Sequence, residues 1–344
     1  MAEETTEVTS GVTSERPTES EPSRLLWASA TFVAGALLSG QSRMNGELAV
    51  RLGHGLAAAL WSFGSGLAVL TVLVLVSSRV RSGFTRLREA LRSNQIRLWQ
   101  CLGGAVGGLY VFSQAYAVPI SGVALFTIAV VGGQTVNAVV VDRLGIGPAG
   151  AVAVNRARLV AAGLAVIGVV VAVGGRVTGA SSTVVIPVVL AFVVGALMTV
   201  QQATNGRVGV ASGHPMATTW LNFAVGTVVL IVLSGVALAT GDLGPPASID
   251  APWWAWLGGL VGIIVVSVSA VAVRHLGVLQ VMILMLLGQL VTAVGLDAIS
   301  PATRGHLTPI VVLGLAVTLV AAVLAARATR APRAAVHGDV RTSA

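Results

Sequence analysis

Long runs without a charged residue alternate with short charged segments along almost the whole chain. A helix needs about 20 residues to cross the roughly 30 Å hydrocarbon core of a bilayer. Nine uncharged runs come close to this length or exceed it, and the run 98–141, with Pro119 near its middle, is long enough for two spans. The shorter alternating segments of a β-barrel are absent. The pattern therefore predicts ten transmembrane helices, in the runs 25–42, 52–78, 98–141 (two), 159–175, 177–206, 208–241, 251–273, 275–296 and 305–326.

Composition agrees with a membrane protein and excludes other classes. Of the 344 residues, 55% are hydrophobic and 10% are charged, whereas a soluble domain carries about 25% charged residues. So few charges cannot cover the surface of a soluble globular enzyme. Cys101 is the single cysteine, which excludes a disulfide scaffold. The net charge of +8 comes from arginines, and Arg-rich loops of a membrane protein explain it without a nucleic-acid partner.

The distribution of arginines predicts how the chain is oriented. With the N-terminus inside, 17 of the 21 arginines fall in inner segments, as the positive-inside rule requires. Both termini are then cytoplasmic, and the protein is a multi-pass protein of the cytoplasmic membrane. The Glu/Ser/Thr/Pro-rich segment 1–24 is expected to be a disordered tail, not a signal peptide. The segment 329–344 is expected to be a second cytoplasmic tail.

Two blocks of sequence repeat within the chain. Residues 32–70 match 192–230 with 16 identities in 39 positions, and residues 99–142 match 254–297 with 19 identities in 44 positions. The chain is therefore expected to contain two copies of a five-helix unit, over 25–175 and 184–328. Because five is odd, the second copy enters the membrane from the opposite side. Inverted repeats of this kind are the architecture of many secondary transporters.

The repeated motifs resemble a known family. Each half contains GALxxxQxxxNG, then GH, LGGxxG, GQ and a helix-ending Asp. This order resembles the YdcZ-like family of the drug/metabolite transporter superfamily, with two five-helix units fused in one chain over about 25–328. The resemblance implies an all-α inverted-repeat permease or exporter of small molecules. The halves also differ, since Arg207 stands where the first half has Glu47, and Arg274 where it has Pro119.

Repeated amide side chains are the first candidates for a substrate site. Gln41 and Asn45 share one helix face, and Gln201 and Asn205 repeat the pair in the second half. Polar groups at membrane depth usually face the interior of a bundle. They are predicted to line a central cavity, although hydrogen bonds to neighbouring helices, with Asn-Gly as a helix end, would also explain them. The same two explanations apply to Gln134, Asn137 and Gln289 in the fourth and ninth spans.

Aromatic side chains are further candidates. Trp61, Tyr110 and Trp220 lie within or near the ends of spans and could stack on a planar ligand, although packing explains such residues more often.

The acidic residues near the spans are candidates for coupling or gating. Glu47, Asp142 and Asp297 are these residues, and no acid falls at the middle of a predicted span. Asp142 and Asp297 end the fourth and ninth spans, where a carboxylate opposes the helix dipole. A gate latch, a proton site or an interfacial ion pair would each explain them. Suitable partners are Arg143, Arg156 or Arg158 for Asp142, and Arg304 for Asp297.

These features predict a transporter that moves a small polar metabolite or drug-like solute by alternating access. A neutral or zwitterionic solute is favoured, because amides and not carboxylates mark the expected cavity. The alternatives are a lipid-handling protein of flippase type and a membrane assembly partner that transports nothing. No enzyme constellation, metal site or cofactor is predicted. The expected partners are the solute, membrane lipid and a coupling proton or ion, and the choice between monomer and homodimer stays open. The segment 79–97 is either an amphipathic helix on the inner leaflet or an ordinary loop.

Overall fold

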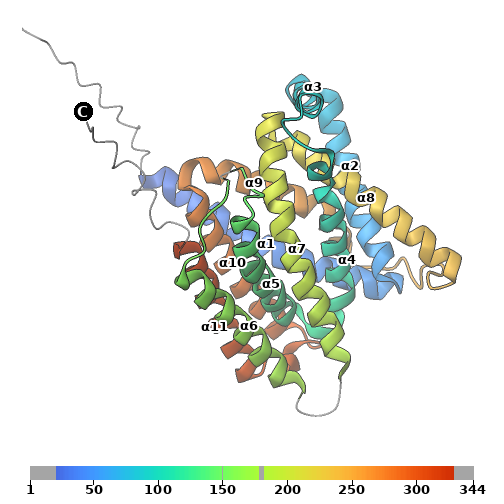
Figure 1. Ribbon diagram of the computed structural model, residues 1–344. Coiled ribbons are helices and arrows are strands. Elements are labelled where there is room, and N and C mark those ends of the chain that lie inside the picture. Colours follow the sequence, from blue (N-terminus) through green and yellow to red (C-terminus); the bar gives the residue numbers. More distant parts are fainter. Residues whose placement is uncertain (1–20, 149, 178–181, 329–344) are drawn as a thin grey trace, which may run out of the picture.

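The computed structural model describes residues 21–148, 150–177 and 182–328. This part of the chain is helical and contains no strand, and Figure 1 shows the helices packed as one bundle. The predicted tails 1–20 and 329–344 lie outside the described residues, and the first helix already begins at Glu21. The helices are α1 (Glu21–Leu52), α2 (Gly55–Val76), α3 (Ser78–Arg92), α4 (Gly103–Ser121), α5 (Val123–Arg143), α6 (Arg156–Val177), α7 (Val185–Ser212), α8 (Pro215–Thr240), α9 (Gly258–Leu276), α10 (Val278–Ile299) and α11 (Pro309–Ala328), with 3-10 turns η1 (Leu98–Leu102), η2 (Ser182–Val184), η3 (Trp253–Leu257) and η4 (Arg304–His306).

Nine helical segments among the described residues are long and apolar enough to cross a membrane. They coincide with nine of the ten predicted spans. The expected split of the run 98–141 occurs at Gly122, which caps the end of α4 with a positive φ of 82° before α5 begins, and Pro119 lies inside the last turn of α4. The first predicted span, 25–42, lies within α1, which is not among the nine. It contains Gln41 and several serines, which make it less apolar than the others. The count of ten therefore stays a prediction.

The two halves pack against each other through reciprocal contacts. Where a residue of the first half touches a residue of the second, the counterparts of both residues also touch, as a twofold axis requires. Several of these contacts are glycines so close to the facing backbone that a Cβ atom would not fit. The reciprocal pairs are Gly104–Asn222 and Gly259–Ser62, Gly133–Phe192 and Gly288–Phe32, and Gly35–Met285 and Gly195–Val130. At these positions the contacts between the two repeated sequences are therefore equivalent.

Phe63 and Phe223 mark the centre of this arrangement. They are counterparts in the repeat, and their rings stack with centroids 4.9 Å apart. Gly66 leaves room for the ring of Phe223, and Gly226 leaves room for the ring of Phe63. Helices α2 and α8 thus cross at the pseudo-twofold axis, and the rings form part of the wall of the cavity described below.

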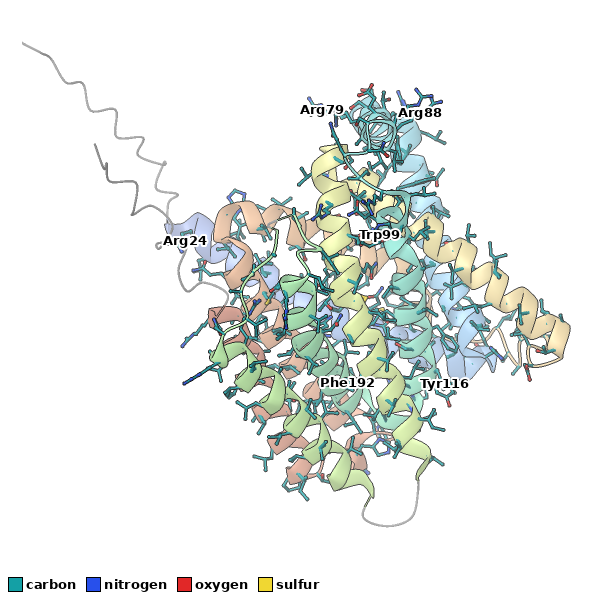
Figure 2. The ribbon with its side chains drawn as sticks, viewed as in Figure 1. Arg24, Arg79, Arg88, Trp99, Tyr116 and Phe192 are labelled. Carbon is teal, nitrogen blue, oxygen red and sulfur yellow. The ribbon has the colours of Figure 1, made fainter. Side chains whose placement is uncertain are left out.

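Helix α3 projects at one end of the bundle, near the C-terminal end of α7 (Figure 1). Ser77 caps it, and its side chain accepts a hydrogen bond from the Val80 amide. The segment 79–97 therefore contains the predicted amphipathic helix. However, its apolar residues Val80, Leu87 and Ala90 are buried, because the helix packs on α7 and α8. Its arginines face outward, as Figure 2 shows for Arg79 and Arg88.

Candidate functional site

A cavity of about 590 Å³ lies between the two halves. This volume is typical of a site for a small molecule. Helices α7, α8 and α9 contribute most of its wall, and α1, α2 and α4 contribute the rest. The lining residues are Leu38, Gln41, Phe63, Gly107, Tyr110, Val111, Gln201, Asn205, Gly206, Gly209, Val210, Pro215, Thr218, Thr219, Asn222, Phe223, Gly262, Val265, Val266, Ala270 and Val273.

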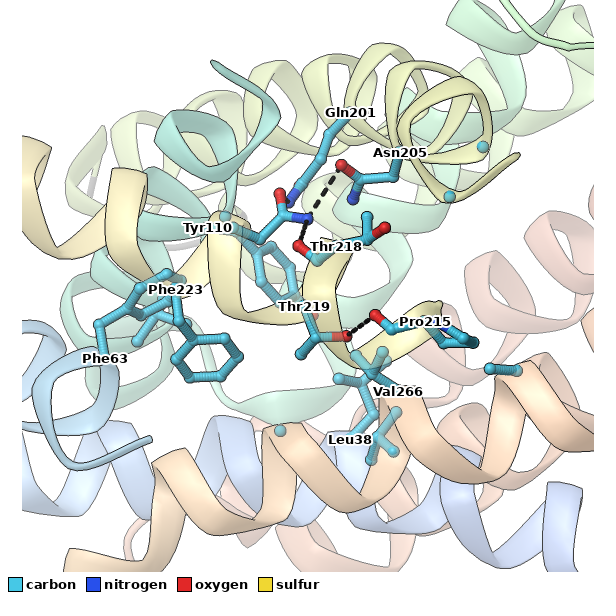
Figure 3. Close-up of a pocket in the computed structure, with 18 of the residues that line it drawn as sticks. Leu38, Phe63, Tyr110, Gln201, Asn205, Pro215, Thr218, Thr219, Phe223 and Val266 are labelled. Carbon is cyan, nitrogen blue, oxygen red and sulfur yellow. Dashed lines mark hydrogen bonds between the residues drawn. The ribbon is translucent and has the colours of Figure 1, made fainter. Parts of the chain in front are cut away.

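Three amide side chains form a connected chain on the α7–α8 wall of this cavity (Figure 3). Gln201 Nε2 donates to Asn222 Oδ1 at 3.2 Å. Asn222 Nδ2 in turn donates to Asn205 Oδ1 and to the Thr218 carbonyl, each at 3.0 Å. These bonds fix which atom of each amide faces which neighbour. They leave Gln201 Oε1 buried and without a hydrogen-bond partner.

The opposite wall places the counterpart of Gln201 in a different environment. Gln41 Nε2 donates to the Gly258 carbonyl at 2.8 Å, so this side chain ties α1 to α9 while it lines the cavity. Gly262 stands close to the Gln41 amide, as Gly107 stands close to the Gln201 amide. The two glycines of the LGGxxG motifs thus allow each glutamine to enter the centre of the bundle. Tyr110 completes this part of the wall and is buried.

The cavity is open on one side because the two halves differ there. Helix α1 packs along α4, whereas their counterparts α7 and α9 share almost no close contact. Val210 of α7 lines the cavity and is 74% exposed, which places the mouth between the ends of these helices. Helix α3 flanks the same end, where Arg86 Nε donates to the Ser212 carbonyl at 2.8 Å. The cavity therefore opens on the side of the bundle that carries α3.

The seam between α1 and α4 closes the other side through buried amides. Asn45 Nδ2 donates to Gln114 Oε1 at 2.7 Å, and Gln114 Nε2 donates to Ser42 Oγ at 2.8 Å. All three side chains are at most 1% exposed. The counterpart of Gln114 is Ser269, whose hydroxyl donates to the Val265 carbonyl of its own helix. The second half thus lacks this connection between helices.

The structure brings together four of the ten residues predicted to bind substrate: Gln41, Gln201, Asn205 and Tyr110 line the cavity. The other six lie outside its lining, and most have a visible packing role. Asn45 belongs to the α1–α4 seam. Asn137 Nδ2 donates to the Ala196 carbonyl and to Thr199 Oγ1, which joins α5 to α7. Gln134 and Gln289 are elsewhere on α5 and α10, and the indoles of Trp61 and Trp220 donate to the Trp256 carbonyl and to Thr71 Oγ1.

The two repeated aspartates have different partners. Asp142 forms an ion pair with Arg158, one of the three partners expected for it. Asp297 is 1% exposed, and it accepts hydrogen bonds from the amides of Val123 and Ala124 at 3.0 and 2.8 Å. Its partner is therefore the N-terminus of α5 and not Arg304, since the positive end of a helix dipole can stabilise a carboxylate as a cation does.

The contacts of the two aspartates also differ between the closed and the open side of the cavity. Gly122, at the start of α5, lies against the Asp297 carboxylate. Its counterpart Gly277, at the start of α10, has no neighbour where a side chain would point, and Asp142 is held by Arg158 instead. The contact between an aspartate and the start of a helix is therefore made at the closed side, and the described residues show no such contact at the open side.

Glu47 lies away from the cavity. Its carboxylate pairs with Arg43 at 3.6 Å and with Arg51 at 3.1 Å on the surface of α1. Exposed pairs of this kind contribute little stability. No charged side chain lines the cavity among the described residues, and these residues contain no cluster of three metal ligands.

His54 and His214, the histidines of the two repeated GH motifs, cap the starts of α2 and α8. Each accepts through Nδ1 a hydrogen bond from the second amide of the following helix, Leu56 at 3.3 Å and Met216 at 3.2 Å. For His214, which lies near the cavity mouth, burial and then the charges of Arg86 and Arg79 lower the pKa below its ordinary value of 6.5.

We expect protonation of His214 to weaken the start of α8. Because the pKa is lower in the folded state, the unfolded state binds the proton more readily, and stability is lost as the pH falls below 6.5. His214→Asn keeps a capping side chain that does not titrate. The thermal midpoint of the wild type, relative to this variant, should therefore decrease between pH 7.5 and 5.5. A difference that is the same at both pH values would contradict the assignment.

The sequence did not indicate Asn222, Thr218 and Thr219, which line the cavity. The repeat gives Asn222 no polar amide counterpart, since Ser62 occupies the equivalent position. Its signal was an isolated amide inside the otherwise apolar run 208–241. Gln114 was not predicted either, because its counterpart Ser269 carries no amide.

Comparison with known proteins gives one family match. A family model described as "Putative inner membrane exporter, YdcZ" matches residues 26–171 and again residues 186–324. None of the curated proteins matches the chain. A solved structure described as "Crystal structure of protein" aligns with 90% of this chain and 99% of its own length, at 18% sequence identity and a TM-score of 0.49.

Proposed function

The chain belongs to the YdcZ family of inner membrane exporters, and from this premise we propose that it moves a small molecule across the membrane by alternating access. The substrate would bind in the cavity between the repeats, at Gln41, Gln201, Asn205, Asn222 and Tyr110. The membership accounts for an all-α, multi-pass membrane protein with two equivalent halves. Exchange between two conformations would give each side of the membrane access to the same site.

One observation carries this proposal: a symmetric pair of repeats encloses a cavity that is open on one side only. Helices α1 and α4 are in contact and α7 and α9 share almost no close contact, although the two pairs are equivalent by sequence. We infer a second conformation with the roles exchanged, in which the α7–α9 seam would lack the two amide hydrogen bonds of the α1–α4 seam, because Ser269 stands at the position of Gln114. In it α7 would approach α9, and Asn205 would come near Ser269. Helix α1 would leave α4, and the cavity would open on the other side.

The two aspartates would act as gating residues when the two conformations interconvert. In the conformation described here Asp297 holds the N-terminus of α5 at the closed side. In the exchanged conformation Asp142 would hold the N-terminus of α10, and Asp297 would be released. Glu47 takes no part, because its ion pairs lie within one helix. By the arginine distribution the open side is cytoplasmic, since α3 with its outward arginines stands beside the mouth.

A cross-link across the α1–α4 seam tests the proposal without a known substrate. A Cβ atom at Gly46 would lie 3.3 Å from Cβ of Val118, which is close to the separation in a disulfide. In a Cys101→Ser background, Gly46→Cys with Val118→Cys should therefore form a disulfide. A third cysteine, Val266→Cys, would report access to the cavity, because Val266 lines it and is 41% exposed.

We expect a membrane-impermeant thiol reagent to label the reporter cysteine from both faces of the membrane when the disulfide is reduced. With the disulfide formed, labelling should remain only from the side that carries α3. The variant with Gly46→Cys alone is the matched control and should behave like the reduced protein. Unchanged labelling from both faces after complete cross-linking would refute alternating access at this seam.

A further inference from the structure

The cavity lining restricts the charge of its ligand. Among the described lining residues no carboxylate, guanidinium or imidazole is present, and Tyr110 is the one ionisable side chain. The nearby acids are engaged elsewhere, Asp142 with Arg158 and Asp297 with the start of α5. An ion that enters such a cavity loses its hydration and gains no opposite charge. An uncharged ligand avoids this cost.

The amide chain defines the polar end of the ligand. Gln201 is 8% exposed, and its Oε1 accepts no hydrogen bond, while its Nε2 is already bound to Asn222. A buried acceptor without a donor is costly, so an N–H or O–H group of a ligand is the natural partner for it. At the other end of the chain, Asn205 uses Oδ1 to accept from Asn222, and its Nδ2 remains available to donate to a ligand. The amides of the α7–α8 wall therefore offer a ligand one hydrogen-bond acceptor, Gln201 Oε1, and one donor, Asn205 Nδ2.

The rest of the lining defines the body of the ligand. Apart from Gln41, whose Nε2 is bound to the Gly258 carbonyl, the side opposite the amides consists of the stacked rings of Phe63 and Phe223 and of Leu38, Val265 and Val266 (Figure 3). Flat apolar groups bury well against such rings. This environment does not suit a small, highly polar solute, which would leave its own polar groups without partners.

We propose that the ligand is an uncharged molecule with an aromatic or otherwise apolar body and one polar end that combines an N–H donor with a carbonyl acceptor, as a carboxamide or lactam does. The donor would bind Gln201 Oε1, and the carbonyl would accept from Asn205 Nδ2. This inference rests on the proposed substrate cavity and narrows its ligand to neutral compounds, which excludes both lipophilic cations and zwitterions. Gln201 is then the residue that selects the ligand.

A series of four compounds of one shape tests the inference. Naphthalene-2-carboxamide has the proposed polar end, and its N,N-dimethyl derivative lacks the donor. Naphthalene-2-carboxylate and naphthalene-2-carboxamidinium carry a negative and a positive charge at the same place. Their binding to the purified full-length protein in detergent would be measured by isothermal titration at pH 7.5.

We expect saturable binding of the carboxamide, with an affinity about 5- to 10-fold higher than that of the dimethyl derivative, the value of one hydrogen bond. Both charged compounds should bind at least about tenfold more weakly. The inference is overturned if the carboxamide does not bind saturably, if methylation does not weaken binding, or if either ion binds as tightly.

Two variants of Gln201 separate recognition from general damage to the cavity. Gln201→Ala should remove the difference between the carboxamide and its dimethyl derivative. Gln201→Glu, which keeps the shape and adds a negative charge, should reverse the preference so that the amidinium binds most tightly. Gln202→Ala is the matched control, because this neighbouring glutamine is exposed and lies outside the lining. An unchanged preference in Gln201→Glu would assign selection to other residues and contradict the proposal.

Failure of the ligand proposal can be distinguished from failure of the transport proposal. The cross-link experiment involves no ligand, so one-sided labelling after cross-linking combined with a failed titration would reject the ligand class alone. Selective carboxamide binding combined with unchanged labelling would instead leave a neutral-ligand site in a protein that does not alternate.

Discussion

Asp297→Ala should destabilise the protein more than any other single change at its carboxylates, by about 3 kcal/mol or more. The Asp297 side chain is buried, and it accepts hydrogen bonds from the first two amides of α5. Hydrogen bonds to a charged group contribute about 1.5–3 kcal/mol each, and their loss also leaves the donors buried without partners. Reversible unfolding in mixed detergent micelles would measure the change in free energy.

Two companion variants make this result specific. Asp297→Asn should be intermediate, because the amide retains one acceptor oxygen but directs an NH₂ group towards the second donor. Asp250→Ala, on an exposed loop, should change the free energy of unfolding by no more than about 0.5 kcal/mol. If Asp297→Ala proves as mild as Asp250→Ala, the carboxylate does not anchor α5.

Gln114→Ser should shift the protein towards the conformation that opens opposite α3. The substitution copies the second half into the first, because Ser269 is the counterpart of Gln114. It removes the hydrogen bonds to Asn45 and Ser42 that close the α1–α4 seam. At about 0.6 to 1.7 kcal/mol for each of the two bonds inside a membrane, the population ratio should change by about 8- to 300-fold.

The reverse substitution provides the matched test. Ser269→Gln introduces the missing amide between α7 and α9, where it could bond to Asn205 once these helices meet. It should therefore favour the same outward-opening conformation by closing the α3 side. The double variant should exceed either single one. The ratio of labelling rates of Val266→Cys from the two faces would report each shift, and Gln95→Ser, at an exposed glutamine near the end of α3, should leave the ratio unchanged. Labelling ratios that do not move in the two seam variants would exclude the seam as a gate.

Much of the fold could be predicted because membrane helices follow directly from local sequence. An uncharged run has to satisfy its backbone within itself, so the run lengths locate nine spans, and Gly122 with Pro119 separates two of them. The family was also evident from the motifs, and the match over both halves confirms it. What the runs could not determine is how α1 is placed, because the side-chain N–H groups of Gln41 and Asn45 donate to residues of other helices, far away in the sequence.

The candidate site was only partly predictable, for a related reason. A polar residue in an apolar run signals a buried partner, but the same signal arises when the partner is a neighbouring helix, as for Asn137. Repetition helped with Gln41 and Gln201, which both reach the cavity. Repetition gave no indication of Asn222, because its counterpart Ser62 carries no amide. The two rings at the pseudo-twofold axis were aligned in the repeat, yet sequence alone could not reveal that they touch each other.

The stacked pair Phe63–Phe223 has a consequence for the history of such chains. At a twofold axis a residue meets its own copy, so in a dimer of two identical single-unit chains one mutation would alter both rings at once. Fusion separates the two positions genetically. Each ring, and equally each seam residue, can then drift alone, provided that the glycine opposite it in the other half still accommodates it. Two positions that a dimer of identical chains must change together can therefore change separately in this chain, and the difference between Gln114 and Ser269 is an asymmetry that such a dimer could not acquire.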